Sequence, residues 1–418
     1  MDKITFPYGR ADFYRLITEG DFYVDRTNYI PILESKGDTL LFLRPRRFGK
    51  SLLLSMLENY YDVKKADEFD RLFGHLAIGQ NPTPRHNRYF ILRWNFSEVP
   101  IAGDSETFKH ALSDHINSCI EEFILHYRDM FDHAITLDED NGLRSFRSLL
   151  ANVQTTPYPL YLLSDEYDNF ANEVLMTEQH GGRERYLDLV EGEGLLKTLF
   201  KVVKAALEGR GLERVFITGV SPIVVHDMTS GFNIAKNITL DPDLNELCGF
   251  REEEIEPVLK QMENLCGFSA EQGQEALTMM RTFYNGYRFV AEQPTLVYNP
   301  TLVLYFLKYL QDKRDYPRSL LDDNLAMDRQ KIAYIAHLPN GDQVVATTLN
   351  EEEPLVISQM AGRFGVNDVY YGHKDTSYLA SLLAYFGVLT TGGYTSHGML
   401  HLHIPNLVVR KLYVERMQ

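Results

Sequence analysis

The stretch Thr39-Leu40-Leu41-Phe42-Leu43-Arg44-Pro45-Arg46-Arg47-Phe48-Gly49-Lys50-Ser51-Leu52 carries the strongest structural signal in the chain. Its first five residues form a short, mostly apolar run that ends abruptly at Arg44-Pro45, as a buried strand does. From Ser51 to Tyr60, apolar residues three and four positions apart predict a helix. The predicted order is therefore strand, loop, helix.

A loop at this position suits an anion, because the backbone N–H groups at a helix N-terminus attract negative charge. Gly49 permits close backbone approach, Lys50 can reach the β and γ phosphates of ATP, and the Ser51 hydroxyl can bind Mg²⁺. The sequence departs from G-x-x-x-x-G-K-[ST] because Arg44 replaces the first glycine, although Pro45 can supply part of the turn chemistry. The predicted nucleotide-binding loop comprises Arg44, Pro45, Arg46, Arg47, Phe48, Gly49, Lys50, Ser51 and Leu52.

A second apolar run, residues 158–163, leads directly into Ser164-Asp165-Glu166. Open α/β sheets bind ligands at the carboxyl ends of their strands, so these carboxylates are expected beside the phosphate loop. We predict that Asp165 holds Mg²⁺ and that Glu166 orients or deprotonates the attacking water. The alternative for such acidic residues is a helix cap or a solvated turn, which suits Asp168 and Asn169 better.

Five further side chains are weaker candidates for roles in the same site. Thr218 and Ser221 follow the strand-like run 214–219 and could sense the γ phosphate, although ordinary loop capping explains them almost as well. Arg46 and Arg47, with Arg44, could neutralise transition-state charge in their own subunit or a neighbour's, or could simply be solvated. Arg288, in Tyr284-Asn285-Gly286-Tyr287-Arg288-Phe289, could reach the nucleotide when a lid closes. Otherwise this motif only ends a helix and packs its aromatic rings.

The rest of the pattern predicts an α/β chain of three parts. Strand-like runs at 39–43, 89–95, 158–163, 214–219 and 237–240 alternate with helical ones, which favours a doubly wound parallel sheet over residues 1–240. Residues 241–315 read as a helical lid, with candidate helices at 252–266, 270–284 and 301–310. Residues 316–418 end in a helix, a hairpin and a helix, a winged-helix-like order.

Composition narrows the function classes. The chain has 418 residues, a net charge of −16 and a pI near 5.3, so direct nucleic-acid binding is not expected from its overall charge. Its three cysteines and scattered histidines form no disulfide framework or metal motif. No run is long enough to span a membrane and no secretory signal is visible, so a cytoplasmic protein is expected.

These motifs resemble the bacterial AAA-ATPase-like family of P-loop proteins, of the STAND/ASCE type, whose members often carry a C-terminal PD-(D/E)XK nuclease domain. The resemblance implies ATP binding, a helical lid and a winged helix, and it makes arginine at position 44 ordinary. We find no nuclease motif here, since candidates such as Glu193 to Lys197 read as helical, so the nuclease would follow residue 418 or be a separate protein. The matching stretches are Phe6-Pro7-Tyr8-Gly9 with Asp12-Phe13, Tyr23-Val24-Asp25-Arg26-Thr27, the loop from Arg44 to Ser51, Ser164-Asp165-Glu166-Tyr167-Asp168, Phe216-Ile217-Thr218-Gly219-Val220-Ser221-Pro222, Gly231-Phe232-Asn233 and Tyr284-Asn285-Gly286-Tyr287-Arg288-Phe289.

Two functions from different classes follow. The first is an ATPase whose Mg²⁺-dependent hydrolysis drives a conformational or assembly switch, controlling a protein effector such as a nuclease, with defence against foreign nucleic acid suggested by the family analogy alone. The second is a module that holds ATP, hydrolyses little and recruits a partner. The second carboxylate, Glu166, favours the enzyme, because a pure binder does not need it. A homo-oligomer is compatible with both, and an arginine acting between subunits would require one.

Overall fold

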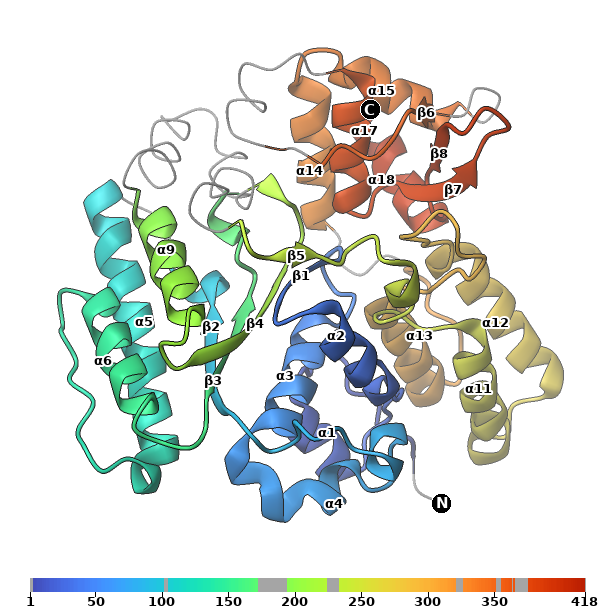
Figure 1. Ribbon diagram of the computed structural model, residues 1–418. Helices are drawn as coiled ribbons and strands as arrows, with labels where there is room; N and C mark the ends of the chain where they lie inside the picture. Colours follow the sequence, from blue (N-terminus) through green and yellow to red (C-terminus); the bar gives the residue numbers. More distant parts are fainter. Residues whose placement is uncertain are drawn as a thin grey trace.

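The computed structural model describes residues 3–100, 104–171, 194–223, 233–320, 326–350, 355–362, 364 and 375–417. A five-stranded sheet in the order β2-β3-β4-β1-β5 lies at its centre, and all of its described strand pairs are parallel (Figure 1). The strands are β1 (Thr39–Leu43), β2 (Phe90–Asn95), β3 (Leu160–Asp165), β4 (Leu212–Gly219) and β5 (Lys236–Asn237).

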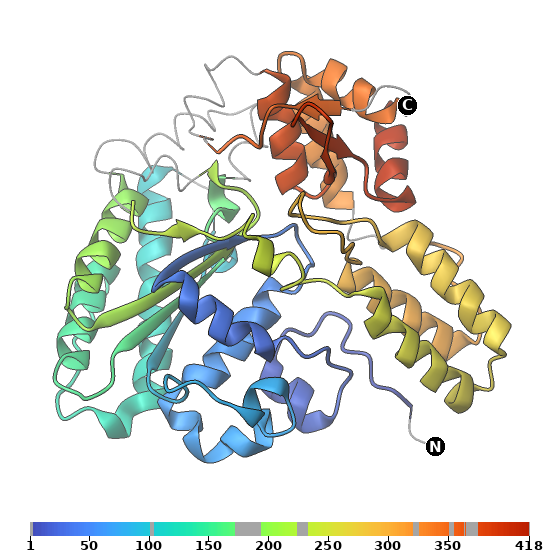
Figure 2. The same ribbon diagram turned by 45° about the vertical axis from the view of Figure 1, so that its right-hand side comes forward.

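Helices cover both faces of this sheet (Figures 1 and 2). Every residue of β1 and β3 is buried, as expected for parallel strands between two helical layers. One layer holds α5 (Ser105–Tyr127), α6 (Gly142–Val153) and α9 (Leu195–Leu207), and the other holds α1 (Phe13–Glu19), α2 (Ile30–Lys36), α3 (Lys50–Tyr61) and α4 (Phe69–Phe73). The predicted α/β, doubly wound fold is confirmed.

Two strand boundaries differ from the sequence-based prediction. Strand β3 starts and ends two residues later than expected, so Asp165 is its last residue and not part of the following loop. The fifth strand is shorter than the expected 237–240, because the Leu43 N–H is bonded to the Thr239 side-chain Oγ1 at 3.1 Å and not to a backbone carbonyl. The backbone ladder between β1 and β5 therefore stops after Ile238, whose N–H donates to Leu41 O.

The predicted lid helices are present as α11 (Glu252–Cys266), α12 (Ala270–Tyr284) and α13 (Pro300–Lys313). They enclose a hydrophobic cluster of their own, which contains Met262, Met280 and Phe306. Asn299 caps α13 by accepting from the N–H groups of Thr301 and Leu302, which fixes the start of that helix. The helical region thus has a small core distinct from that of the sheet.

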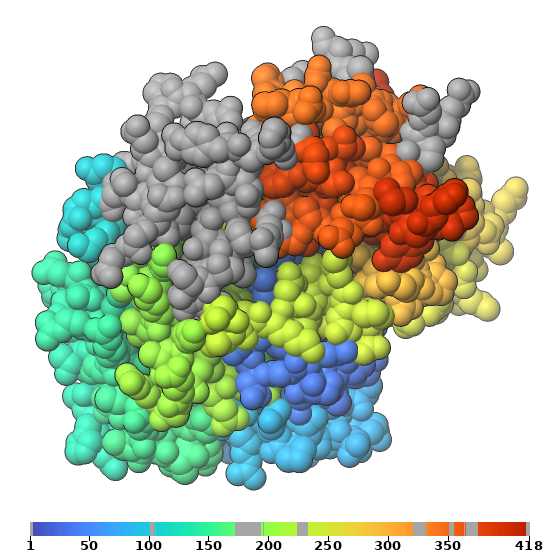
Figure 3. All heavy atoms as spheres, turned by 45° about the horizontal axis from the view of Figure 1, so that its top comes forward, coloured from blue at the N-terminus to red at the C-terminus, as the bar shows by residue number. Residues whose placement is uncertain are grey.

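The C-terminal region combines helices with a second sheet of order β6-β8-β7, which lies at the top of Figure 1. The expected helix, hairpin and helix are present, and the sequence did not indicate β6 or the two helices that precede it. The sphere view shows this region in orange and red beside residues near 240 in yellow-green (Figure 3). The elements are α14 (Ala326–His337), α15 (Gly341–Leu349), β6 (Leu355–Ile357), α17 (Thr376–Tyr385), β7 (Thr390–Tyr394), β8 (Leu400–His403) and α18 (Leu407–Met417).

The division into three parts at residues 240 and 315 stays a prediction. Buried residues of the C-terminal region, such as Leu379 and Leu402, belong to the same continuous cluster as the sheet core. Among the described helices, none has both the length and the apolar character that crossing a bilayer requires. Gly231 and Phe232 of the matching stretch Gly231-Phe232-Asn233 lie outside the described residues.

Candidate functional site

The predicted phosphate loop connects the end of β1 to the start of α3. Gly49 precedes the first helical residue, Lys50, and has a positive φ of 91°, a conformation that suits glycine. Arg47 also has a positive φ, 67°, which is uncommon for a residue with a side chain. The chain therefore turns sharply into α3, so that the N–H groups at the helix N-terminus are presented at the carboxyl edge of the sheet.

Arg44 bonds to buried backbone and is absent from the lining of the cavity described below, so the geometry does not support its predicted contact with the nucleotide. Its side chain is 1% exposed, and its guanidinium donates to three backbone oxygens, Leu43 O at 2.9 Å, Thr239 O at 2.8 Å and Leu244 O at 2.7 Å. The guanidinium carbon also lies 4.4 Å from the centre of the Phe42 ring and 4.1 Å from that of Phe289. Burial lowers the pKa of Arg44 to about 10. The guanidinium thus ties the end of β1 to the segment after β5.

Lys50 is 5% exposed, and its Nζ donates to Pro45 O across the loop at 3.1 Å. Burial lowers the pKa of Lys50, and the nearby carboxylates of Asp165 and Glu166 oppose this effect. Among the residues that the structure describes, this bond to the loop is the one hydrogen bond of the ammonium group. An incoming phosphate can replace Pro45 O as its acceptor.

Asp165 joins the loop to two strands. Its Oδ2 accepts from the Ser51 hydroxyl at 2.6 Å, and its Oδ1 accepts from the Thr218 hydroxyl at 2.6 Å. The sequence separations are 114 and 53 residues, and the sheet order brings the three side chains together because β4 lies between β1 and β3. Oxygen donors of this type, a carboxylate and hydroxyls, suit Mg²⁺.

Glu166 lies directly after β3 and lines the cavity described below. Its φ is 49°, so the backbone turns there into a strained left-handed conformation. Burial raises the pKa of Glu166, and the positive charges of Lys50 and Arg46 act in the opposite direction. A carboxylate with a raised pKa beside a phosphate loop is a suitable general base.

Asp168, for which the sequence suggested a helix cap or a solvated turn, is not solvated. It is buried, and its carboxylate accepts from Val220 N at 3.1 Å, from Ser221 N at 2.7 Å and from the Ser221 hydroxyl at 2.9 Å. The Ser221 hydroxyl thus donates to Asp168, so this geometry does not place it as the expected phosphate sensor. Gly219 belongs to this arrangement, because a Cβ there would lie 2.4 Å from Asp168 Oδ1 and would force a neighbouring side chain to move.

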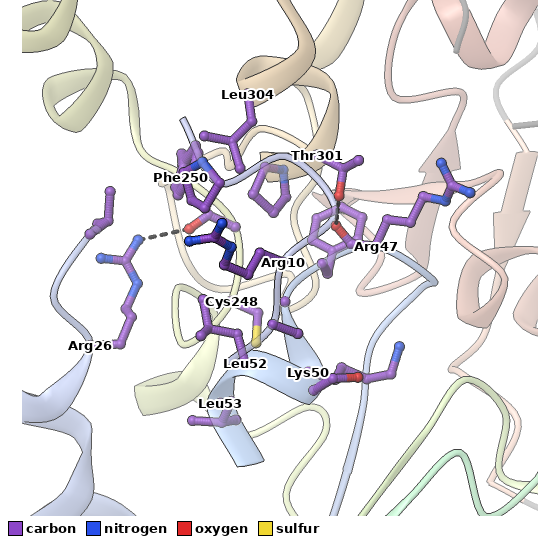
Figure 4. A pocket seen from close by; sticks show the side chains of 18 of the residues that line it. Arg10, Arg26, Arg47, Lys50, Leu52, Leu53, Cys248, Phe250, Thr301 and Leu304 are labelled. Atoms are coloured by element: carbon purple, nitrogen blue, oxygen red, sulfur yellow. Dashed lines mark hydrogen bonds between the residues drawn. The ribbon is translucent and has the colours of Figure 1, made fainter. Parts of the chain in front are cut away.

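A cavity of about 350 Å³ opens beside the loop (Figure 4). Its described walls include Phe48, Gly49, Lys50, Ser51 and Leu52 of the loop and helix start, Glu166 after β3, and residues of three other segments. These are the N-terminal residues 7–26, residues 247–250 ahead of α11, and Pro300, Thr301 and Leu304 of α13. The sequence indicated the motifs in 6–27 and the Arg44-to-Ser51 loop, but it did not indicate that these two segments face each other.

Two arginines on the N-terminal wall of the cavity, Arg10 and Arg26, each form an ion pair with a carboxylate. Arg10 donates to Asp21 Oδ2 at 2.6 Å, and Arg26 donates to Gly249 O at 2.7 Å and to both carboxylate oxygens of Glu254. Figure 4 shows the guanidinium groups of Arg10 and Arg26 near one another, with the Arg26 to Gly249 bond dashed. Arg26 connects the N-terminal segment to the first turn of α11, and so sets the width of the cavity on that side.

Arg46 and Arg47 have different positions. Arg46 donates to Asn169 Oδ1 at 3.3 Å, and it is absent from the described cavity lining. Arg47 lines the cavity and its carbonyl accepts from the Thr301 hydroxyl at 3.0 Å, while its side chain extends away from Arg10 and Arg26 (Figure 4). The Thr301 bond links the phosphate loop directly to α13.

The aromatic residues around Arg288 hold the loop from the other side. The Phe48 ring packs edge-on against Tyr287 at 4.8 Å and against Phe289 at 5.3 Å between ring centres. Arg288 itself points elsewhere, donating from Nε to Thr391 O at 3.0 Å and from its backbone N–H to the Thr390 hydroxyl at 2.7 Å. It is absent from the described cavity lining, so this geometry does not meet the expectation of a nucleotide contact. It matches the alternative of a packing motif.

Comparison with known proteins identifies the family. The family model described as predicted AAA-ATPase matches residues 7–229, more than half of the chain. The protein belongs to this family. A relative called "Uncharacterized protein in vnfD 5'region", from Azotobacter chroococcum mcd 1, is 27% identical over 357 residues, which cover 83% of this chain and 60% of that protein. The chain therefore matches less than two thirds of that relative's length.

Solved structures offer only a distant likeness. The Aeropyrum pernix ORC2 protein in its ADPNP-ADP complexes is 11% identical, with a TM-score of 0.42 over 96% of this chain and 98% of that chain. The Aeropyrum pernix ORC1 protein in complex with DNA is 10% identical, with a TM-score of 0.29 over 99% and 94%. At these scores we draw no argument from either, and the fold assignment rests on the sheet order and the phosphate loop.

Proposed function

We propose that this AAA-ATPase-like protein binds Mg²⁺ and ATP in the cavity beside the phosphate loop and hydrolyses the ATP. The observation that supports this best is the hydrogen-bonded set of Ser51, Asp165 and Thr218, which the sheet assembles next to Lys50. A purely structural network would have no reason to include a loop lysine and a second, partly desolvated carboxylate, Glu166. Proteins that hydrolyse nucleotides need all of these groups.

The roles follow from the chemistry of each group. Lys50 exchanges Pro45 O for the β and γ phosphate oxygens and neutralises their charge. Ser51 and Asp165 fit a hard cation by their donor type, and Mg²⁺ bound there supplies positive charge against the phosphates. Glu166 accepts the proton of the attacking water, and Thr218 keeps Asp165 oriented between β3 and β4.

Of the two loop arginines, Arg47 is better placed to neutralise negative charge in the transition state, because it lines the cavity and Arg46 does not. Either residue can act within the chain or on a neighbouring copy, and the second option requires a homo-oligomer. Arg44 and Ser221 are left out of the proposed site, since their polar groups already bond buried backbone or Asp168.

We further propose that the reaction drives a switch that controls a protein effector. The loop contacts α13 through the Thr301 to Arg47 bond, and it contacts the Tyr287 region through Phe48. Arg288 then bonds β7 of the C-terminal sheet. A change in the loop on phosphate binding therefore reaches both the lid and the C-terminal region. A nuclease effector and a defence role rest on the family resemblance alone.

Steady-state phosphate release tests this function. The parent should release phosphate from ATP in the presence of Mg²⁺, Glu166→Gln should bind ATP with parent-like affinity but lose turnover, and Lys50→Ala should lose binding. Asp165→Asn should weaken the Mg²⁺-dependent part of binding. Equal ATP affinity in Lys50→Ala and the parent refutes the phosphate-loop assignment. Turnover retained in Glu166→Gln refutes the assigned base. ATP binding by the parent without measurable phosphate release favours instead the module that holds ATP and hydrolyses little.

A further inference from the structure

A second hollow lies on the other flank of the molecule, between α6 and the C-terminal half of α9, which are neighbours at the left of Figures 1 and 2. Its volume is about 340 Å³. Three cationic side chains line it, Arg147 from α6, Lys201 from α9 and Arg210 from the turn after α9. Its floor is apolar and is formed by Leu150, Val202, Ala205 and Ala206. None of these residues belongs to the ATP cavity.

The three cations lack partners within the described part of the chain. Other basic residues on the same helices are paired, since Arg144 donates to Asp138 at 2.7 Å and Lys204 donates to Asn233 at 2.7 Å. No hydrogen bond or ion pair joins the side chain of Arg147, Lys201 or Arg210 to a described residue. Three unpaired positive charges around one hollow repel each other, and an anion placed among them relieves that repulsion.

The charge of the whole protein makes this site selective. The net charge is −16, so long anionic polymers are repelled at a distance, and three cations are fewer than the six to ten phosphate contacts that tight nucleic-acid binding commonly uses. The apolar floor adds a requirement that a bare phosphate does not meet. A protein segment with carboxylates beside one apolar side chain meets both, because the carboxylates pair with the cations while the apolar group covers Leu150 and Val202.

We propose that the hollow between α6 and α9 is a docking site for an acidic segment of a partner protein, with one apolar residue seated on its floor. Arg147 of α6 and Arg210 of the turn after α9 offer planar, two-pronged contacts to carboxylates, and Lys201 of α9 supplies a third positive charge. The site does not depend on ATP hydrolysis, so the test of this proposal is independent of the test of the proposed reaction.

Fluorescence anisotropy of the full chain tests the proposal with a labelled twelve-residue probe that contains Glu and Asp around a central Leu. The parent should bind the probe, and binding should weaken as salt rises. A matched peptide with Gln and Asn in place of the acids should bind at least tenfold more weakly. The triple variant Arg147→Gln, Lys201→Gln, Arg210→Gln should lose at least tenfold in affinity.

A control triple of equal charge change separates the site from bulk electrostatics. Lys236, Lys260 and Lys313 are exposed and lie outside the hollow, so their replacement by Gln should leave probe affinity within twofold of the parent. Ala205→Glu places a carboxylate inside the hollow and should block the probe without removing any cation. Both triple variants should melt like the parent, because the replaced cations are exposed.

Four results overturn the proposal. The first is failure of the probe to bind the parent at millimolar concentration. The second is a loss of affinity in the control triple that equals the loss in the Arg147, Lys201 and Arg210 triple. The third is a single-stranded DNA twelve-mer that binds more tightly than the acidic peptide and loses affinity in the Arg147, Lys201 and Arg210 triple. That result would assign the hollow to nucleic acid. The fourth is self-association, measured by sedimentation, that the Arg147, Lys201 and Arg210 triple abolishes. That result would make a second copy of this chain the occupant.

Discussion

Replacing Arg44 by alanine tests whether this unusual first residue of the phosphate loop is structural or binds nucleotide. The variant removes three hydrogen bonds to buried carbonyls, of Leu43, Thr239 and Leu244, and leaves a gap between the Phe42 and Phe289 rings. Each buried carbonyl left without a donor in this site, which is 1% exposed, costs about 1–3 kcal/mol, so the three together cost several kcal/mol.

That loss is a large part of the stability of an ordinary domain, which is roughly 5–15 kcal/mol. For a domain of this size it corresponds to a fall in melting temperature on the order of 10 °C. Arg44→Lys should fall between the parent and the alanine variant, because one ammonium group cannot reach three carbonyls in the fork geometry of a guanidinium. The melting temperature without nucleotide, followed by differential scanning fluorimetry, measures both effects.

The ATP-induced rise in melting temperature separates the two roles. Arg44 is absent from the described cavity lining, so Arg44→Ala should keep most of the rise that saturating Mg²⁺ and ATP produce. Lys50→Ala is the matched control with the opposite pattern, a parent-like melting temperature without ATP and no rise with it. An Arg44→Ala variant that melts like the parent without nucleotide, yet shows no ATP-induced rise, would place the guanidinium on the phosphates and refute our assignment.

The remaining predictions concern the base, the packing motif and nuclease activity. Burial raises the pKa of Glu166 above its ordinary value of 4.5, and the base must be deprotonated, so turnover should fall as pH drops through that raised pKa; a pH profile without this acidic limb contradicts the assignment. Arg288→Ala should melt below the parent without ATP and retain the ATP-induced shift, because its bonds go to Thr391 and Gln293; a parent-like melting temperature with a smaller ATP shift and reduced turnover would restore the sensor role. The purified chain should not cut DNA or RNA with Mg²⁺ or Mn²⁺, since no group of three or more metal-ligating His, Cys, Asp or Glu side chains occurs among the described residues; cleavage lost on changing one of its own acids would overturn this.

Much of the fold could be predicted because its signals are local. The apolar run 39–43, the glycine at 49 and the leucine spacing after Ser51 each constrain only neighbouring residues, and the structure reproduces that strand and helix. The helices at 252–266, 270–284 and 301–310 were predicted in the same way from local pattern, and the structure shows that Ser269 and Asn299 cap two of them. Asp165 and Glu166 were found because an apolar run ended in two acids.

What local patterns could not provide was the direction of long side chains. Arg44 looked like a phosphate ligand because of its place in the loop, but its guanidinium is fixed by carbonyls of Thr239 and Leu244, about two hundred residues away in the sequence. Ser221 looked like a sensor, and its hydroxyl is instead bound by Asp168, 53 residues earlier. Hydrogen-bond partners at such distances depend on strand order, which no window of sequence contains.

The sequence by itself determined the phosphate loop, the strands and helices around it, and the acids that end β3, because turn chemistry and periodicity are properties of consecutive residues. Only the tertiary structure decided which of those polar groups meet. The order β3-β4-β1 brings the hydroxyls of Ser51 and Thr218 to the two carboxylate oxygens of Asp165, and the fold of the N-terminal segment against residues 247–250 forms the cavity. These contacts are set by packing between distant segments, where burial leaves each polar group only the partners that the fold places within reach.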